Sequence, residues 1–190
     1  MTSPREKNYV DGERKASFTN MREMLQVGDV APEFFLCEGN DYRNKIPAVD
    51  INNEPISIRD FDEKCLVLIF ISEPREDWQV NARIEFLKEL SGFADKCKEI
   101  GGELVAVSMD EYGMMPECLD KAEVTFRHIF ASHETPVIHD YKAYAGVARA
   151  LTYAIAGGKI QQGWDQTYPK SFDESHFQEV LTYITANNLA

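Results

Sequence analysis

The sequence predicts an α/β fold with a central mixed β-sheet flanked by helices, and two features carry this prediction. An apolar run at 65–71 is followed by a long amphipathic segment and then by a second apolar run at 104–108. Uniformly apolar runs are typical of parallel strands buried on both faces, so these stretches predict a right-handed βαβ unit. Farther along, Ala156-Gly157-Gly158 separates two strand-like runs at 151–155 and 159–162, which predicts a β-hairpin.

The segment between the apolar runs has the period of one buried helix face. The residues on that face are Val80, Ile84, Leu87, Leu90, Ala94, Cys97 and Ile100, and Gly101-Gly102 ends the helix. In βαβ units, ligands bind beyond the carboxyl end of the first strand, at the N-terminus of the helix. Residues 73–78 occupy that place, and they include no cysteine.

The remaining chain predicts further elements on either side of this unit. Residues 1–25 are polar and mixed in charge, and we interpret them as an N-terminal extension with a short helix at 18–25. A single domain then spans 26–190. Its further predicted elements are a strand within 28–36, a turn at 52–53, a short strand at 56–58, a helix at 111–122, a strand at 125–130, helical residues at 139–145 and a terminal helix at 172–188.

Composition excludes several classes of protein. The chain has 190 residues and a net charge of −12, which disfavours a general binder of nucleic acid phosphates. No apolar run is long enough to span a bilayer, and the N-terminus lacks the apolar core of a signal peptide. We therefore expect a cytoplasmic protein without nucleic acid or membrane partners.

The four cysteines, Cys37, Cys65, Cys97 and Cys118, form no C-x-x-C pair and predict neither a disulfide scaffold nor a zinc site. Cys65 and Cys97 fall on apolar faces and are expected in the core. Cys118 is the cysteine most expected to be exposed, and Cys37 the next, although acidic neighbours disfavour a reactive thiolate at both. The histidines lack the spacing of metal ligands, so we expect no metal and no cofactor.

The order of elements is that of the thioredoxin fold, with an N-terminal β addition. Five short motifs resemble the peroxiredoxin-like branch of the thioredoxin superfamily, the redoxin group of alkyl hydroperoxide reductases and thiol-specific antioxidants. They are Gly28-x-x-Ala31-Pro32-x-Phe34, the segment 56–61, Val107-Ser108-x-Asp110, Tyr144-Ala-Gly-Val147 and the segment 149–155. The resemblance covers 26–165 and implies an antioxidant-type oxidoreductase fold, and also a homodimer.

Peroxide-reducing members of that family carry P-x-x-x-T-x-x-C at the start of the central helix and a distant arginine that assists the thiolate. This chain keeps the proline as Pro74 and the arginine as Arg149. Trp78 stands at the threonine position. The cysteine position is Asn81 when counted from Pro74, or near Arg83 when counted back from Asp110. The peroxidatic cysteine is therefore missing, and the family's mechanism is unavailable at its usual place.

Two interpretations of this region remain open. In the first, Pro74, Glu76, Asp77, Trp78, Asn81 and Arg149 form a remodelled pocket, and an exposed Trp78 and Trp164 line it together. In the second, Glu76 or Asp77 caps the helix and Trp78 fills space. Under both, we expect Arg149 to form an ion pair with Glu76 or Asp77.

Two functions follow from these interpretations. One is a pseudoenzyme that binds a small molecule or protein partner, or serves as an assembly subunit. The alternative is an enzyme that repurposes the pocket, through a relocated thiol at Cys118 or Cys37, or through acid–base chemistry by Glu76, Asp77 and Arg149.

Overall fold

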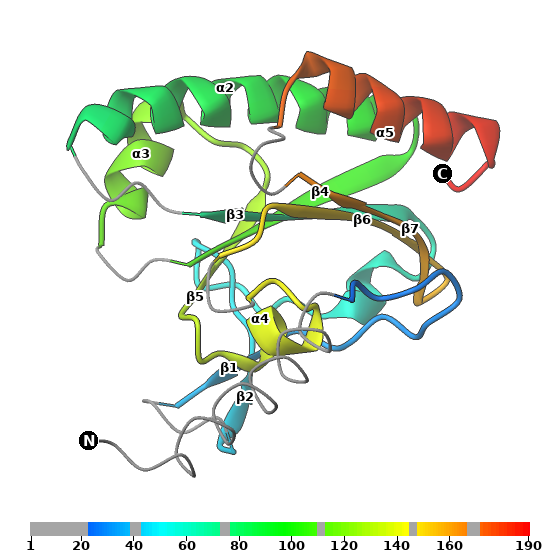
Figure 1. Ribbon diagram of the computed structural model, residues 1–190, viewed down its shortest axis with the longest axis horizontal. Helices are drawn as coiled ribbons and strands as arrows, with labels where there is room; N and C mark the ends of the chain where they lie inside the picture. Colours follow the sequence, from blue (N-terminus) through cyan, green and yellow to red (C-terminus); the bar gives the residue numbers. More distant parts are fainter. Residues whose placement is uncertain (1–22, 39–42, 73–76, 110–112, 145–147, 167–171) are drawn as a thin grey trace, which may run out of the picture.

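A five-stranded sheet forms the centre of the molecule (Figure 1). The computed structural model describes residues 23–38, 43–72, 77–109, 113–144, 148–166 and 172–190, with only the backbone at Asp77 and Trp78. The sheet has the strand order β5-β4-β3-β6-β7. Its strands are β3 (Cys65–Ser72), β4 (Gly102–Met109), β5 (Arg127–Ala131), β6 (Leu151–Ala156) and β7 (Lys159–Asp165).

The predicted βαβ unit is confirmed. Strand β3 pairs in parallel with β4, and α2 (Asp77–Glu99) connects them. All residues of β3 except Ser72 are buried, as expected for a strand covered on both faces. Strand β4 begins at Gly102. A Cβ at this position would lie 3.1 Å from the Cys65 carbonyl oxygen, so only glycine fits without movement of the backbone.

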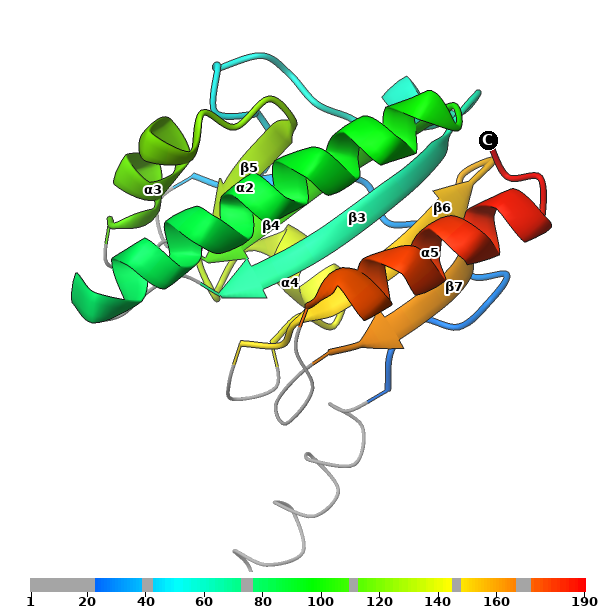
Figure 2. The ribbon, with the colours of Figure 1, turned by 90° about the horizontal axis from the view of Figure 1, so that it is seen from above.

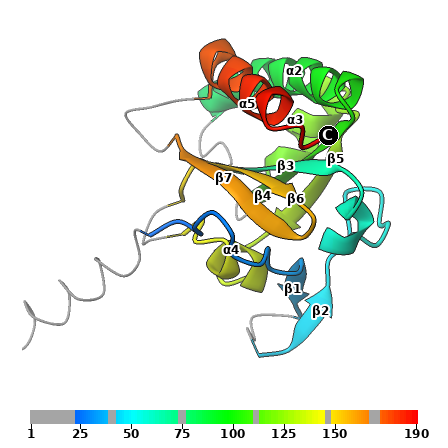
Figure 3. The ribbon, with the colours of Figure 1, turned by 90° about the vertical axis from the view of Figure 1, so that its right-hand side faces the viewer.

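Helices cover one face of the sheet, and shorter elements cover the other (Figures 1 and 3). On the first face lie α2, α3 (Met115–Ala122) and α5 (Glu174–Ala186). The rings of Phe93 and Phe177 stack there, with centroids 4.6 Å apart, and join α2 to α5. On the opposite face lie α4 (Pro136–Asp140), the 3₁₀ helix η1 (Ile58–Phe61) and the small sheet of β1 (Phe35–Cys37) and β2 (Lys45–Pro47).

Two segments from the first third of the described chain form hydrogen bonds with the outermost strands of the sheet. At β7, the Gly28 backbone N–H donates to the Ile160 carbonyl, and the Ile160 N–H donates to the Asp29 carbonyl. At β5, the Ile51 N–H donates to the His128 carbonyl. The N-terminal β addition therefore contacts both edges of the sheet.

Several predicted boundaries and one predicted element were wrong. The strand expected within 28–36 is reduced to an isolated bridge at Val30 and the short β1. Residues 56–58 lead into η1 instead of forming a strand, because Ser57 and Asp60 form a reciprocal capping box. The helix expected at 139–145 is α4, whose start is set by Pro136. The helix proposed at 18–25 lies mostly outside the described residues.

None of the described helices combines the length and apolar character needed to cross a bilayer.

The end of α3 offers a test of local backbone strain. Glu123 is exposed and follows the helix in the left-handed region, with φ of 53°. A side chain is disfavoured there, whereas glycine is not, so Glu123→Gly should raise the free energy of unfolding by about 0.5–1 kcal/mol. Urea denaturation of the two proteins measures the difference. A loss of stability would show that the glutamate contributes a contact that outweighs the strain.

Candidate functional site

The predicted site lies at the carboxyl ends of β3 and β4, beside the first turns of α2 (Figure 2). Ser72 ends β3 and pairs with Met109 of β4. Pro74 and Glu76 lie outside the described residues, as do the side chains of Asp77 and Trp78. The pocket predicted from these four residues therefore stays a prediction, and the described part of the site is formed by residues deeper in α2 and in β4, β5 and α3.

The structure separates the two candidates for the missing cysteine position. Asn81 is exposed on α2, whereas Arg83 is half-buried. Residues two positions apart on an α-helix are rotated by about 200° about the helix axis, so the side chains of Asn81 and Arg83 leave the helix in nearly opposite directions. Arg83 is the one directed toward the sheet.

Arg83 is half-buried and yet lacks a carboxylate partner within the described residues. Its Nη2 lies 3.5 Å from the Ser72 hydroxyl, its guanidinium carbon lies 5.2 Å from the Phe86 ring centroid, and its Nε is buried without a hydrogen-bond partner. Burial lowers the pKa of Arg83, and the nearby Cys118 opposes that effect. By contrast, Arg127 pairs with Asp50 and Asp60.

A buried histidine lies within electrostatic reach of Arg83. His128 of β5 is fully buried, and its Nε2 lies 2.8 Å from the Ser108 hydroxyl of β4. Burial, with a contribution from the Arg83 charge, lowers the pKa of His128 to about 3, so the ring is neutral at pH 7. Its Nδ1 finds no hydrogen-bond partner in the described part of the chain. A buried polar atom without a partner is uncommon and destabilising.

The four thiols are not placed for chemistry at this site. Cys118 lies on α3 with 0% of its surface exposed, so the expectation that it is exposed was wrong. It falls on the apolar face of α3, which packs on the core. Cys65 and Cys97 are buried as predicted, and burial raises their pKa values to about 11 and about 12. Cys37 of β1 is only half-buried.

Arg149 precedes β6 and forms an ion pair with a residue that we did not single out from the sequence. Its Nη2 lies 2.7 Å from the Asp165 carboxylate, and its Nη1 donates to the Lys142 carbonyl at 3.0 Å. The hairpin register places Asp165 opposite Leu151 and therefore near Arg149, a signal available in the sequence. The predicted pairing with Glu76 or Asp77 falls on side chains outside the described set.

The prediction that Trp164 is exposed was wrong, and its shared pocket with Trp78 stays a prediction because the Trp78 side chain lies outside the described residues. Successive side chains of a strand point to opposite faces of the sheet, so Trp164 points to the face opposite the one that Asp165 and its partner Arg149 share. Trp164 is only 8% exposed and packs in the core between the sheet and α5. Its indole N–H donates to Glu179 of α5 at 2.9 Å, and its ring meets Tyr183 edge-on.

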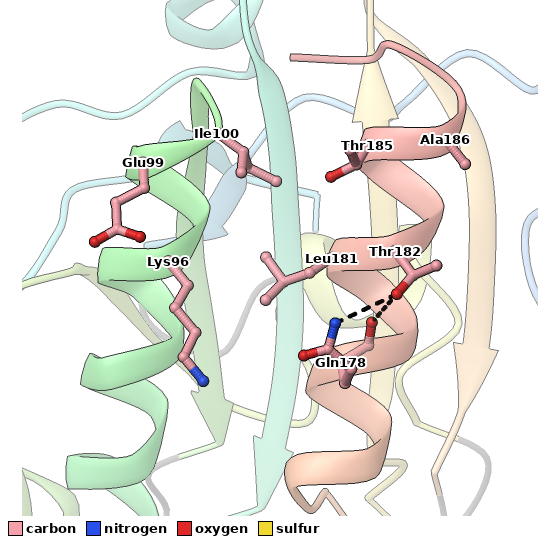
Figure 4. Close-up of a pocket in the computed structure, with 8 residues that line it drawn as sticks. All are labelled: Lys96, Glu99, Ile100, Gln178, Leu181, Thr182, Thr185 and Ala186. Atoms are coloured by element: carbon pink, nitrogen blue, oxygen red, sulfur yellow. Dashed lines mark hydrogen bonds between the residues drawn. The ribbon is translucent and has the colours of Figure 1, made fainter.

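A separate groove lies between the C-terminal half of α2 and α5 (Figure 4). It has a volume of about 510 Å³. Its lining residues are Lys96, Glu99, Ile100, Gln178, Leu181, Thr182, Thr185 and Ala186. Because it lies along the last turns of α2, the groove is at the far end of the sheet from Ser72 (Figure 2).

Comparisons with known proteins identify the fold. No family model matches the sequence, and no curated protein matches it. Among solved structures, a peroxiredoxin Q from Xylella fastidiosa is 16% identical, with a TM-score of 0.61 over 87% of this chain and 99% of the other. The thioredoxin domain of a thiol-disulfide oxidoreductase from Bacteroides vulgatus is 15% identical, with a TM-score of 0.57 over 84% and 99% of the two chains.

A thiol:disulfide interchange protein from Chlorobium tepidum is also similar, with 20% identity and a TM-score of 0.56 over 85% and 97% of the two chains. These neighbours share the mixed sheet and its flanking helices, and they confirm the fold class predicted from the element order. The chain therefore has the thioredoxin-like α/β fold found in peroxiredoxin Q and in thiol-disulfide oxidoreductases.

Proposed function

We propose that this chain is a peroxiredoxin-like protein without peroxidase chemistry, and that it works as a binding or assembly subunit. The location of its cysteines carries the proposal. No cysteine occurs between Cys65 and Cys97, so α2 begins without a thiol. Cys65, Cys97 and Cys118 are fully buried. Peroxide reduction needs an accessible thiolate, because the thiolate sulfur attacks the peroxide oxygen.

The surroundings of Arg149 support the same conclusion. In the family that the sequence resembles, the corresponding arginine assists the reacting thiolate. Here the Asp165 carboxylate lies 2.7 Å from the guanidinium, and only 6% of the Arg149 side chain is exposed. The Asp165 carboxylate therefore neutralises the Arg149 charge that would otherwise stabilise a thiolate.

The groups that remain near the end of β3 suit recognition better than electron transfer. A guanidinium and a hydroxyl come from Arg83 and Ser72, and neither of them changes oxidation state under cellular conditions. These groups can hold a polar ligand by charge and hydrogen bonds.

A second candidate is thiol redox chemistry at Cys118. The observation in its favour is that Cys118 and the Arg83 guanidinium lie within electrostatic range of each other. Its complete burial argues against this candidate, since peroxide would have to reach the sulfur through a packed core. The half-buried Cys37 is the other thiol that remains, and acid–base chemistry by Glu76, Asp77 and Arg149 is the non-thiol alternative.

Brief exposure to near-stoichiometric hydrogen peroxide separates the two candidates. We expect the intact mass to stay unchanged over minutes, because three thiols are buried and Cys37 is half-buried beside the acidic Glu38. Peptide mapping locates any product. An all-cysteine-to-serine variant controls for methionine oxidation, and Cys118→Ser and Cys37→Ser assign a reactive thiol. Rapid and selective oxidation of one cysteine would overturn the proposal and establish a redox enzyme.

A further inference from the structure

The half-buried arginine of α2 indicates what the proposed binding site recognises, and this inference rests on the proposed function. We propose that Arg83, with Ser72, binds the carboxylate group of a small-molecule ligand at the carboxyl end of β3. The guanidinium supplies the charge and the paired N–H donors, and the Ser72 hydroxyl supplies a further donor.

The first argument is the missing countercharge. A partly buried cation is costly unless an anion is nearby, and proteins usually provide one. Arg127 has Asp50 and Asp60, and Arg149 has Asp165. Arg83 forms no ion pair with a described residue, although the chain has 32 acidic residues against 20 basic ones. Arg59 also lacks an ion pair among the described residues, but it is exposed to solvent; Arg83 is half-buried, and its charge is left for a ligand.

The second argument is the state of the individual nitrogen atoms. Nε is buried and unpaired, and one face of the guanidinium lies against Phe86. Nη2 has only a long contact of 3.5 Å with Ser72. Nη1 forms no hydrogen bond with a described residue, and it is not among the buried unpaired atoms, so solvent reaches it. The Nη1–Nη2 end is thus the open one, and its two parallel donors match the two oxygens of a carboxylate.

The third argument concerns which anion fits. A singly charged carboxylate loses less hydration free energy than a doubly charged phosphate on entering a partly buried site. The net charge of −12 also repels a dianion more than a monoanion. The place is the one where βαβ units commonly bind ligands, beyond the end of the first strand. A carboxylate is therefore favoured over a phosphate.

The test is a titration of the full-length, reduced, ¹⁵N-labelled protein with sodium formate, with sodium chloride lowered to hold the ionic strength constant. The Arg83 Nε–H signal is the main reporter, since the buried Nε is shielded from exchange with water. We expect a saturable shift of this signal and of the backbone signals of Ser72 and Arg83. Formate affinity should fall about tenfold or more in Arg83→Gln, which removes a charge-assisted contact.

Arg59→Gln is the matched control, because Arg59 is exposed and loses the same charge. It should keep the wild-type response. Arg83→Lys keeps the charge without the paired donors, so it should bind formate more weakly than the wild type and guards against a folding defect in Arg83→Gln. An unsaturable shift, or equal responses in wild type and Arg83→Gln, would overturn the proposal.

A parallel titration with inorganic phosphate tests the choice of anion, and saturation by phosphate alone would overturn the carboxylate assignment. The titration is independent of the peroxide experiment. A reactive cysteine together with saturable formate binding would end the proposed function but leave the carboxylate site. Inert thiols without saturable formate binding would leave the proposed function but end the carboxylate site.

Discussion

Acidification from pH 6.5 toward pH 3 should destabilise the fold by on the order of 4 kcal/mol through His128 alone. The unfolded ring has a pKa of 6.5, whereas burial and the Arg83 charge lower the pKa of the folded ring to about 3. Between these values the unfolded chain binds one more proton than the folded chain, so stability rises with pH. The contribution is complete above pH 6.5 and is lost as the pH falls through this window.

Urea denaturation at several pH values between 7 and 4 measures the effect. The control is the double variant Ser108→Ala/His128→Phe, which removes both partners of the 2.8 Å hydrogen bond and leaves neither of them unpaired. All other ionisable groups are the same in both proteins, so the difference between the two curves isolates His128. Parallel curves in this range would show that the imidazole is not buried as a neutral ring.

Phe93→Ala should lower the free energy of unfolding by about 3–5 kcal/mol. The ring is 2% exposed and stacks on Phe177 of α5 with centroids 4.6 Å apart. Truncation removes buried apolar surface and leaves a cavity between the two long helices, where the packed sheet limits collapse. Guanidinium denaturation monitored by circular dichroism gives the difference.

Phe86→Ala is the matched comparison, since Phe86 also lies on α2 and stacks on Phe172 with centroids 5.7 Å apart. Both of those rings are only half-buried, so the loss should be about 1–2 kcal/mol. Equal losses for the two variants would mean that the contact between α2 and α5 contributes no more than a surface stack.

The sequence was sufficient for elements whose pattern is local. The uniform burial of β3 follows from its apolar run, and the buried face of α2 follows from the spacing of Leu87, Leu90 and Ala94. The turn into η1 was misread although the capping box of Ser57 and Asp60 is local, and a distant residue also holds this turn. The Glu33 carboxylate accepts hydrogen bonds from the Ser57 hydroxyl and the Ile58 N–H, and nothing near residues 56–58 shows this.

The site was harder to predict because its members come from separate elements. Ser108 and His128 meet only because β5 pairs with β4 in a particular register, and the sequence does not specify that register. Counting residues left Arg83 and Asn81 as alternatives, and only the rotational position of α2 separates them. Cys118 was expected at the surface, but it falls on the apolar face of α3 and is fully buried.

The contacts of the N-terminal segments with the two outermost strands have a consequence for self-association. Unpaired backbone groups at a sheet edge can pair with the edge of another molecule and seed aggregation. Here Gly28 and Asp29 occupy backbone groups of β7, and Ile51 occupies one of β5. The same part of the chain therefore obstructs intermolecular strand pairing on both sides, and this protection does not depend on charged side chains along either edge.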